Sequence, residues 1–258
     1  MTIIYMKAKL ISNFSPRIYQ QSIFANSLDK NSLVVLPTGL GKTVISLMLA
    51  VYYFNKKNKK ILFLAPTRPL VEQQKKSFES FIENSIDLTF QIFTGQVSPE
   101  KRRTLYEKCD FIFSTPQLIE NDLVNSIINP KDFSFVIFDE CHRASGNYAY
   151  NFIAREFSKT NCNFLGLSAS PGVSLEEVKS IINNLSINHV EVKKSTDDDV
   201  KPYVKETEIK KIEVELPIEL KKISDDLKLV FKKNLENLNS LGYLKGKTIL
   251  NITKKDLL

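Results

Sequence analysis

The chain has 258 residues, of which 43% are hydrophobic and 25% are charged, and its formal net charge is +7. This composition excludes a collagen, a coiled coil and a disordered chain. The three cysteines and two histidines lack zinc-ligand spacing, and no apolar run reaches the roughly 18 residues that span a membrane. We therefore expect a cytoplasmic protein with reduced thiols and no membrane segment. The positive charge is compatible with a nucleic-acid partner but does not establish one.

Six short apolar runs alternate with helical patterns between Ser32 and Ser170, and nearly all of the runs end in Pro, Gly, Thr, Ser or Asp. Strands that alternate with helices build a parallel sheet, so we expect an α/β fold, a doubly wound sheet with helices on both faces. Ligands bind at the carboxyl ends of strands in such sheets. The expected strands are residues 33–36, 61–65, 88–93, 111–114, 135–138 and 164–167.

A glycine turn follows the first expected strand and leads into a helix that opens near Thr43. Consecutive N–H groups in such a loop suit a polyphosphate, the lysine reaches the β- and γ-phosphates, and the threonine hydroxyl binds Mg²⁺. Leu36 stands where the strict pattern has its first glycine, which is compatible if its side chain points into the core. The predicted nucleotide-binding residues here are Pro37, Thr38, Gly39, Leu40, Gly41, Lys42 and Thr43.

Two adjacent carboxylates, Asp139 and Glu140, follow the expected strand 135–138. Asp139 is predicted to hold Mg²⁺ and Glu140 to orient and deprotonate the attacking water, which favours a hydrolase over a kinase. His142 is expected to couple this site to a neighbouring loop by hydrogen bonds. Together with Lys42, these three residues are the predicted catalytic set.

These residues resemble motifs I, II and III of superfamily-two helicases, with Ser168, Ala169 and Ser170 as motif III. Residues 17–20 resemble the adenine-reading Q motif, in which Arg17 and Gln20 would lie at the base. Residues 142–150 resemble most specifically the archaeal Hef and Fanconi anaemia M-type branch of DNA helicases and translocases. The resemblance implies a RecA-like domain that uses ATP and Mg²⁺ and couples hydrolysis to nucleic acid through motif III.

Residues 67–74, 94–95 and 114–117 look like the motifs that lie along one nucleic-acid strand in this family. Threonine hydroxyls and helix-start N–H groups suit phosphate oxygens. Each threonine alone is more typical of an ordinary helix cap or turn, but the set, in register between the glycine turn and the Asp139–Glu140 pair, favours a nucleic-acid contact. Arg102 and Arg103 are expected on a solvated helix face, and Tyr148 and Tyr150 to pack against the sheet. The predicted nucleic-acid residues are Thr67, Arg68, Thr94, Gly95, Thr115 and Pro116.

The alternation of apolar runs and helical patterns stops after about residue 190. We therefore expect a RecA-like helicase domain over 1–190 and the beginning of a helical insert over 191–258. Residues 206–216 alternate like an extended segment. Apolar residues from 220 to 241 recur at helical spacing and predict an amphipathic helix or helical pair packed on protein core. No arginine occurs from residue 190 to 258. We therefore expect a second RecA-like domain in the parent protein and poor ATP turnover by the isolated chain.

The resulting prediction is the N-terminal motor domain of an ATP-dependent superfamily-two DNA helicase or translocase that acts on forked or branched DNA at the nucleoid. Two alternatives stay open from the residues. One is a duplex-RNA-stimulated ATPase, which shares the Asp-Glu-Cys-His sequence, and the other is an ATP-binding scaffold module that does not hydrolyse its nucleotide.

Overall fold

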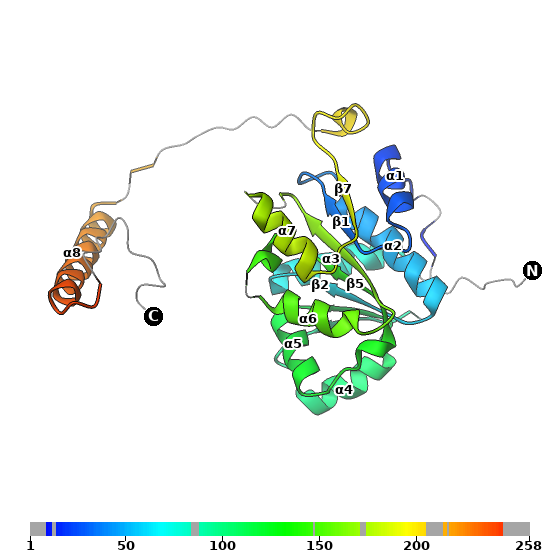
Figure 1. Ribbon diagram of the computed structural model, residues 1–258, viewed down its shortest axis with the longest axis horizontal. Coiled ribbons are helices and arrows are strands. Elements are labelled where there is room, and N and C mark those ends of the chain that lie inside the picture. The colour runs from blue at the N-terminus through cyan, green and yellow to red at the C-terminus, as the bar shows by residue number, and fades with distance from the viewer. Residues whose placement is uncertain are drawn as a thin grey trace, which may run out of the picture. The chain divides into compact units, whose positions relative to one another are not determined.

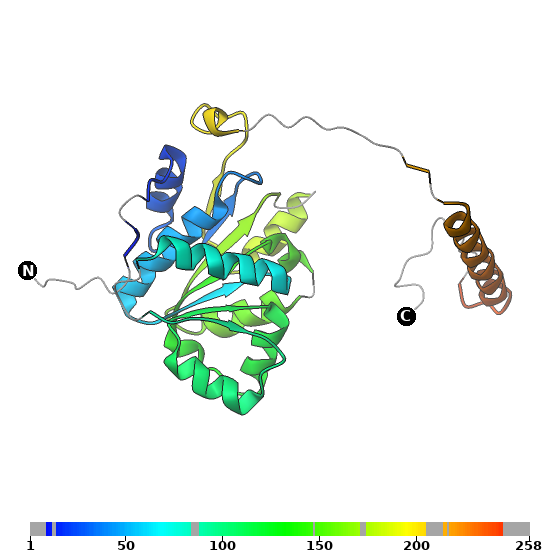
Figure 2. The same cartoon turned by 180° about the vertical axis from the view of Figure 1, so that it is seen from behind.

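The computed structural model describes residues 9–11, 14–83, 88–146, 148–170, 174–204, 214–215 and 217–244. The chain forms two compact units, Met1–Lys205 and Glu206–Leu258. The first unit is a RecA-like α/β domain in which a sheet is covered by helices on both faces (Figure 1; Figure 2). This confirms the predicted fold class.

Over the residues described, the sheet has seven strands in the order β3-β4-β2-β5-β6-β1-β7, and every pairing between neighbours is parallel. All strands therefore end at the same edge. Six of them lie within two residues of the expected strands, and the seventh, at the edge beside β1, was not expected. The strands are β1 (Ser32–Val35), β2 (Lys60–Leu64), β3 (Phe90–Phe93), β4 (Phe111–Ser114), β5 (Phe133–Phe138), β6 (Asn163–Ser168) and β7 (His189–Val192).

Two apolar clusters cover the two faces of the sheet because successive strand side chains point to opposite sides. One face is packed by α1 (Ile18–Ser27), α2 (Lys42–Lys57) and α3 (Arg68–Phe81). The other is packed by α4 (Pro99–Lys108), α5 (Pro116–Val124), α6 (Ala149–Ser158) and α7 (Leu175–Asn184). Short 3₁₀ helices are η1 (Pro130–Asp132), η2 (Cys141–Ser145) and η3 (Lys201–Tyr203).

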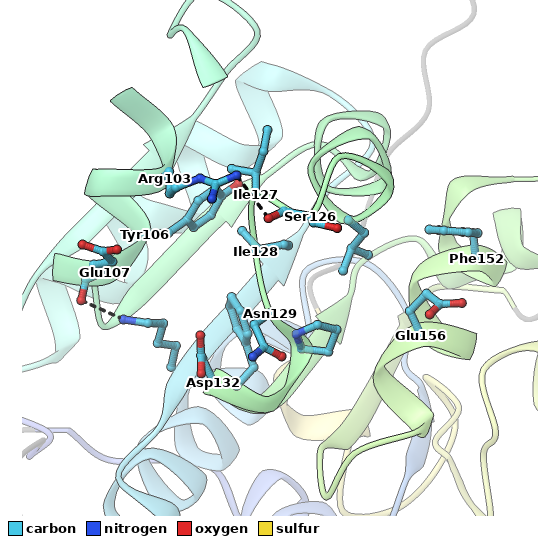
Figure 3. A pocket seen from close by; sticks show the side chains of 14 residues that line it. Arg103, Tyr106, Glu107, Ser126, Ile127, Ile128, Asn129, Asp132, Phe152 and Glu156 are labelled. Carbon is cyan, nitrogen blue, oxygen red and sulfur yellow. Dashed lines mark hydrogen bonds between the residues drawn. The ribbon is translucent and has the colours of Figure 1, made fainter. Parts of the chain in front are cut away.

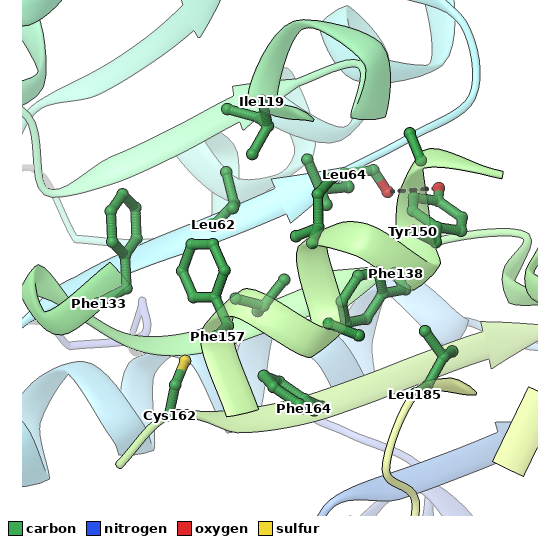
Figure 4. Close-up of a cluster of buried hydrophobic side chains, with 14 of the residues drawn as sticks. Leu62, Leu64, Ile119, Phe133, Phe138, Tyr150, Phe157, Cys162, Phe164 and Leu185 are labelled. Atoms are coloured by element: carbon green, nitrogen blue, oxygen red, sulfur yellow. Dashed lines mark hydrogen bonds between the residues drawn. The ribbon is translucent and has the colours of Figure 1, made fainter. Parts of the chain in front are cut away.

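Aromatic side chains hold the strand ends in place on the second face (Figure 4). Phe138, at the end of β5, meets Tyr150 edge-on with ring centroids 5.2 Å apart and Phe164 with centroids 5.8 Å apart. All three rings are buried. Burying a large apolar side chain stabilises a fold by roughly 1.5–3 kcal/mol. The tip of β5, where the two carboxylates begin, is therefore rigidly supported.

The first unit reaches Lys205, beyond the expected domain boundary at residue 190. The reason is structural: β7 pairs with β1, and Val200 is fully buried in the core. In the second unit, residues 220–240 of the expected apolar stripe lie on one continuous helix, α8 (Ile218–Ser240). Leu235 on this helix is buried, whereas most of the expected apolar stripe is exposed.

The expected extended segment at 206–216 lies outside the described residues except for 214 and 215. Among the described helices, none is long and apolar enough to cross a membrane. The cysteines at 109, 141 and 162 are free and buried.

Candidate nucleotide and nucleic-acid site

The sheet order brings most of the predicted site residues to one edge. The phosphate loop follows β1, Asp139 follows β5, and Ser168 ends β6, which lies between those two strands. The other half of the edge is formed by β2, β4 and β3, which are followed by Thr67, Thr115 and Thr94. We call these three residues the threonine row. The edge therefore has a nucleotide half and a threonine half that meet between β2 and β5.

The phosphate loop has the backbone that a polyphosphate needs. Gly39 and Gly41 have φ values of 78° and 80°, in the left-handed region that favours glycine. Leu36 is fully buried, and its N–H donates to the Ser168 carbonyl at 3.0 Å, so the replacement of the first motif glycine is accommodated by the core. Gly41 caps α2 without any side chain. The N–H groups of the first turn of α2 are thus suited to an anion.

Lys42 and Thr43 already have partners within the protein. The Lys42 ammonium donates to the Leu36 carbonyl at 2.9 Å, and the Thr43 hydroxyl donates to Gln74 Oε1 at 3.0 Å. Burial lowers the pKa of Lys42, while the charges of Glu140 and Asp139 act in the opposite direction. Either side chain would give up its hydrogen bond within the protein on contacting a ligand.

The carboxylate pair is asymmetric. Asp139 is only 7% exposed, and burial, assisted by the neighbouring charge of Glu140, raises its pKa to about 6. Its Oδ1 accepts the Glu140 N–H at 3.0 Å, and its backbone carbonyl accepts the Tyr150 hydroxyl at 2.6 Å. Glu140 has φ 50°, a left-handed conformation. The two neighbouring side chains thus lie in different environments, with Asp139 the more buried of the two. Tyr150 packs against the sheet as expected.

A chain of polar contacts joins the carboxylates to the end of β6. His142 Nδ1 lies 3.2 Å from Glu140 Oε2 and 3.3 Å from Ser168 Oγ. The Ser168 hydroxyl donates to the Ser170 carbonyl and accepts the Ser170 N–H, while Ala169 is half-buried between them. The structure therefore brings the predicted coupling residues together, and their role in coupling stays a prediction.

A cavity of about 340 Å³ lies between the start of α1 and the phosphate loop. Gln20 is buried there; its Nε2 donates to the Leu40 carbonyl at 3.1 Å, and its Oε1 accepts the Arg17 N–H at 2.8 Å. A Cβ at Gly41 would lie 2.3 Å from Gln20 Nε2. Sequence reasoning missed Phe14 and Phe81, which line the cavity with their rings 5.6 Å apart. The only signal was that Phe14 lies three residues before the segment 17–20 that resembles the Q motif.

The threonine row lies at helix starts and turns, as predicted. Thr67 and Thr115 are the N-caps of α3 and α5, and neither forms a side-chain cap hydrogen bond. Arg68 is exposed and bonds Glu72 at 2.8 Å, and Gly95, after Thr94, is exposed. Pro116, in contrast, is buried in the first turn of α5. Its side chain fixes the start of the helix and offers no surface to a nucleic-acid strand.

The expectation that Arg102 is solvated is wrong. Its guanidinium is buried and binds both oxygens of Asp122, at 2.5 and 2.9 Å, and it also donates to the Val97 carbonyl. The Tyr106 hydroxyl donates to the same carboxylate at 2.8 Å. Only Arg103 is exposed, where it donates to the Ser126 carbonyl at 3.3 Å.

A larger cavity of about 570 Å³ lies away from this edge (Figure 3). Its lining includes Lys60 and Phe133, at the amino ends of β2 and β5, together with Arg103, Ile127 and Phe152. The strand-end residues described above are at the opposite ends of these strands. This cavity is therefore separate from the nucleotide half of the sheet edge.

Fold and site together define a P-loop ATP-binding domain of RecA type. The family model described as DEAD/DEAH box helicase matches residues 17–178, and the chain belongs to this family.

Several relatives are similar over most of this chain. It is 40% identical over 242 residues to the "Putative ATP-dependent RNA helicase MJ1505" of Methanocaldococcus jannaschii, which covers 94% of this chain and 31% of the relative. It is 36% identical over 234 residues to the "ATP-dependent DNA helicase MPH1" of Saccharomyces cerevisiae. The match covers 90% of this chain and 23% of the relative. For "ATP-dependent DNA helicase fml1" of Schizosaccharomyces pombe the identity is 35% over 244 residues. The match covers 93% of this chain and 29% of the relative. The chain thus spans less than a third of these relatives.

The fold is also similar to a solved structure, "Crystal structure of Pyrococcus furiosus Hef helicase domain". The TM-score is 0.71 and the sequence identity is 42%, over 94% of this chain and 52% of that chain.

Proposed function

We propose that this chain is the ATP-hydrolysing motor domain of a DNA helicase or translocase that acts on forked or branched DNA. The observation that carries the proposal is the sheet edge itself. The phosphate loop and the Asp139–Glu140 pair flank β6, and the threonine row continues along the same edge. The similar yeast proteins are named DNA helicases, which supports DNA as the nucleic acid.

The nucleotide is held by groups on both sides of the phosphate loop. The N–H groups of residues 39–43 and the Lys42 ammonium bind the phosphates, and Gln20 and Arg17 lie at the adenine. Thr43 and Asp139 fit a divalent ion because they supply one hydroxyl and one buried carboxylate near these phosphates. When bound, Mg²⁺ neutralises charge that develops on the phosphate oxygens. Within the described residues no three His, Cys, Asp or Glu side chains gather as a metal site. The remaining ligands of a bound Mg²⁺ would be phosphate oxygens and water.

Glu140 is the base of the proposed reaction. Its carboxylate orients the attacking water and accepts a proton from it as the water attacks the γ-phosphorus, while the bond from the γ-phosphorus to the bridging oxygen breaks and ADP leaves. His142, 3.2 Å away, holds the carboxylate in place. The same imidazole contacts Ser168, so a change at Glu140 on hydrolysis is transmitted to the end of β6.

The nucleic-acid strand is proposed to lie along the threonine row. The hydroxyls of Thr67, Thr94 and Thr115, with the first N–H groups of α3 and α5, donate to phosphate oxygens, and Arg68 adds positive charge. Contacts of this kind do not depend on base sequence, which suits a translocating motor. An intracellular site of action follows from a DNA partner and from the free thiols.

Efficient turnover is proposed to require a second RecA-like domain that brings arginines to the γ-phosphate. Two observations support this: residues 190–258 contain no arginine, and the chain matches 52% of the Hef helicase-domain chain. An arginine of this kind is worth about 10³–10⁵ in turnover. The isolated chain should therefore hydrolyse ATP slowly.

Substitution of the base tests the proposed chemistry. In Glu140→Gln we expect ATP binding to be retained and single-turnover hydrolysis to fall by about 10²–10⁴. Glu176→Gln, at an exposed position in α7, is the matched control and should hydrolyse as the unaltered chain does. Unchanged hydrolysis in Glu140→Gln would exclude Glu140 as the base. Absence of hydrolysis in the unaltered chain within its full-length protein would favour the scaffold alternative.

A second candidate is a duplex-RNA motor, and the Methanocaldococcus relative, which is named an RNA helicase, favours RNA as the nucleic acid. Forked DNA and duplex RNA of the same sequence, compared at one salt concentration, discriminate the two. Tighter binding and stronger ATPase stimulation by forked DNA support the proposal, and the reverse order supports RNA.

A further inference from the structure

The segment that follows β7 returns to the base side of the phosphate loop. In both cartoons it lies beside α1 (Figure 1; Figure 2). It is fixed there by the fully buried Val200, by a 2.6 Å ion pair between Lys193 and Asp199, and by the bond from the Val200 N–H to the Asp197 carbonyl at 2.9 Å. The short helix η3 therefore presents Tyr203 to α1 from a well-supported backbone.

Tyr203 contacts Arg17, which lines the 340 Å³ cavity beside the phosphate loop, and the buried Tyr19. The Arg17 guanidinium carbon lies 4.6 Å from the centroid of the Tyr203 ring, a cation–π distance. The Tyr203 and Tyr19 rings are 5.8 Å apart at 60°. Tyr203 keeps 37% exposure, so it covers Arg17 without being part of the deep core.

Arg17 is connected in turn to the phosphate loop. Its Nη1 donates to the Tyr19 hydroxyl at 3.0 Å, and that hydroxyl donates to the Leu40 carbonyl at 2.6 Å. The same carbonyl accepts Gln20 Nε2 at 3.1 Å. The Leu40 carbonyl, between the two loop glycines, thus accepts hydrogen bonds from Tyr19 and Gln20, and Arg17 is linked to it through Tyr19. The Tyr203 ring lies against the guanidinium of this same Arg17.

We propose that Tyr203 is a positioning residue for adenine-nucleotide binding, and the proposal rests on the ATP site argued above. Its ring holds the Arg17 guanidinium in one orientation beside the cavity. An arginine that is ordered before the ligand arrives loses less conformational freedom on binding. Because the interaction is with the face of an aromatic ring, the ring matters and the tyrosine hydroxyl does not. The two residues are distant in sequence, which is why no local motif reveals the pair.

Nucleotide affinity of three variants tests this role, measured with a fluorescent ATP analogue on the chain. Tyr203→Ala should weaken binding about fivefold, the scale of one exposed cation–π contact, and Tyr203→Phe should bind as the unaltered chain does. Lys201→Ala, on the same short helix, is the matched control and should also be unchanged. The thermal unfolding midpoint without nucleotide should be the same in all three.

A double-mutant cycle with Arg17→Ala distinguishes positioning from a general effect on the fold. In the Arg17→Ala background we expect Tyr203→Ala to cause no further loss of affinity. A second fivefold loss there would show that Tyr203 does not act through Arg17 and would overturn the inference. Normal ATP binding by Tyr203→Ala alone would overturn it too and leave the proposed function intact. Failure of the unaltered chain to bind the analogue would instead contradict the proposed function.

Discussion

The buried side chain of Asp139 destabilises the metal-free protein at pH values at which its carboxyl group is ionised. Its pKa in the folded chain is about 6, raised first by burial and then by Glu140, against an ordinary value of 3.8. The folded state therefore binds this proton more tightly than the unfolded state. The contribution of Asp139 to the free energy of unfolding falls as the pH rises from about 4 to about 6.

Replacing Asp139 by asparagine should remove this penalty. In EDTA, we expect Asp139→Asn to match the unaltered protein near pH 4 and to exceed its free energy of unfolding by up to about 3 kcal/mol above pH 6. Denaturant titrations at the two pH values measure the difference, with the exposed Asp132→Asn as control. A difference that does not change with pH would contradict the raised pKa. Activity should nevertheless be lost, because the amide is a poor ligand for Mg²⁺.

Substitutions at the two loop glycines distinguish the cost of backbone strain from the cost of a side-chain collision. Both have positive φ, but a Cβ at Gly39 meets nothing within 4 Å, whereas a Cβ at Gly41 would meet Gln20. Gly39→Ala should lower the free energy of unfolding by about 1–2 kcal/mol through backbone strain alone. Gly41→Ala should cost more and also weaken ATP binding, because the Gln20 amide must move. Equal losses of stability and affinity in the two variants would show that the Gln20 contact is unimportant.

At the scale of elements, the buried Arg102–Asp122 pair holds α4 against α5 and supports the threonine row. Arg102 also binds the Val97 carbonyl, and the Val97 N–H bonds the Thr94 carbonyl at 3.2 Å. Asp122 lies on the helix that Thr115 caps. The pair therefore fixes two of the three loops proposed to contact phosphates.

Breaking this pair should affect both stability and nucleic-acid binding. Arg102→Met leaves a buried carboxylate unpaired, which costs about 3–5 kcal/mol. Arg103→Met, next to it and exposed, should change stability by less than about 0.5 kcal/mol. Chemical denaturation tests the first effect and titration with forked DNA tests the second. If Arg102→Met weakened ATP binding as strongly as DNA binding, the pair would not act specifically on the threonine half.

The elements that sequence reasoning predicted are those with a local signal. The buried strands read as continuous apolar runs, and the phosphate loop and the carboxylate pair are compact motifs at strand ends. Arg102 has no such signal, because its burial depends on a partner 20 residues along the chain. The strand β7 was missed for a similar reason: Val190 and Val192 are exposed, so it lacks the buried apolar run that identifies the other strands.

At the scale of the whole chain, the position of the first unit's boundary predicts which residues the stability of that unit requires. The unit ends at Lys205, and residues beyond the expected boundary at 190 complete it. They supply the second half of β7, which pairs with β1, the fully buried Val200, and Tyr203 over Arg17. Without them β1 would become an exposed sheet edge directly beneath the phosphate loop.

Two truncated chains test whether the unit is complete at residue 190 or at Lys205. A chain that ends at Lys205 should keep the unfolding midpoint of the sheet unit and its ATP affinity, because residues from Glu206 onward form a separate compact unit. A chain that ends at residue 190 should be less stable by at least the roughly 1.5–3 kcal/mol of the lost Val200 side chain, and should bind ATP more weakly. Thermal unfolding and nucleotide titration of the two chains provide the comparison. Equal stability would mean that β7 and the segment after it only cover a sheet that is already complete at β1.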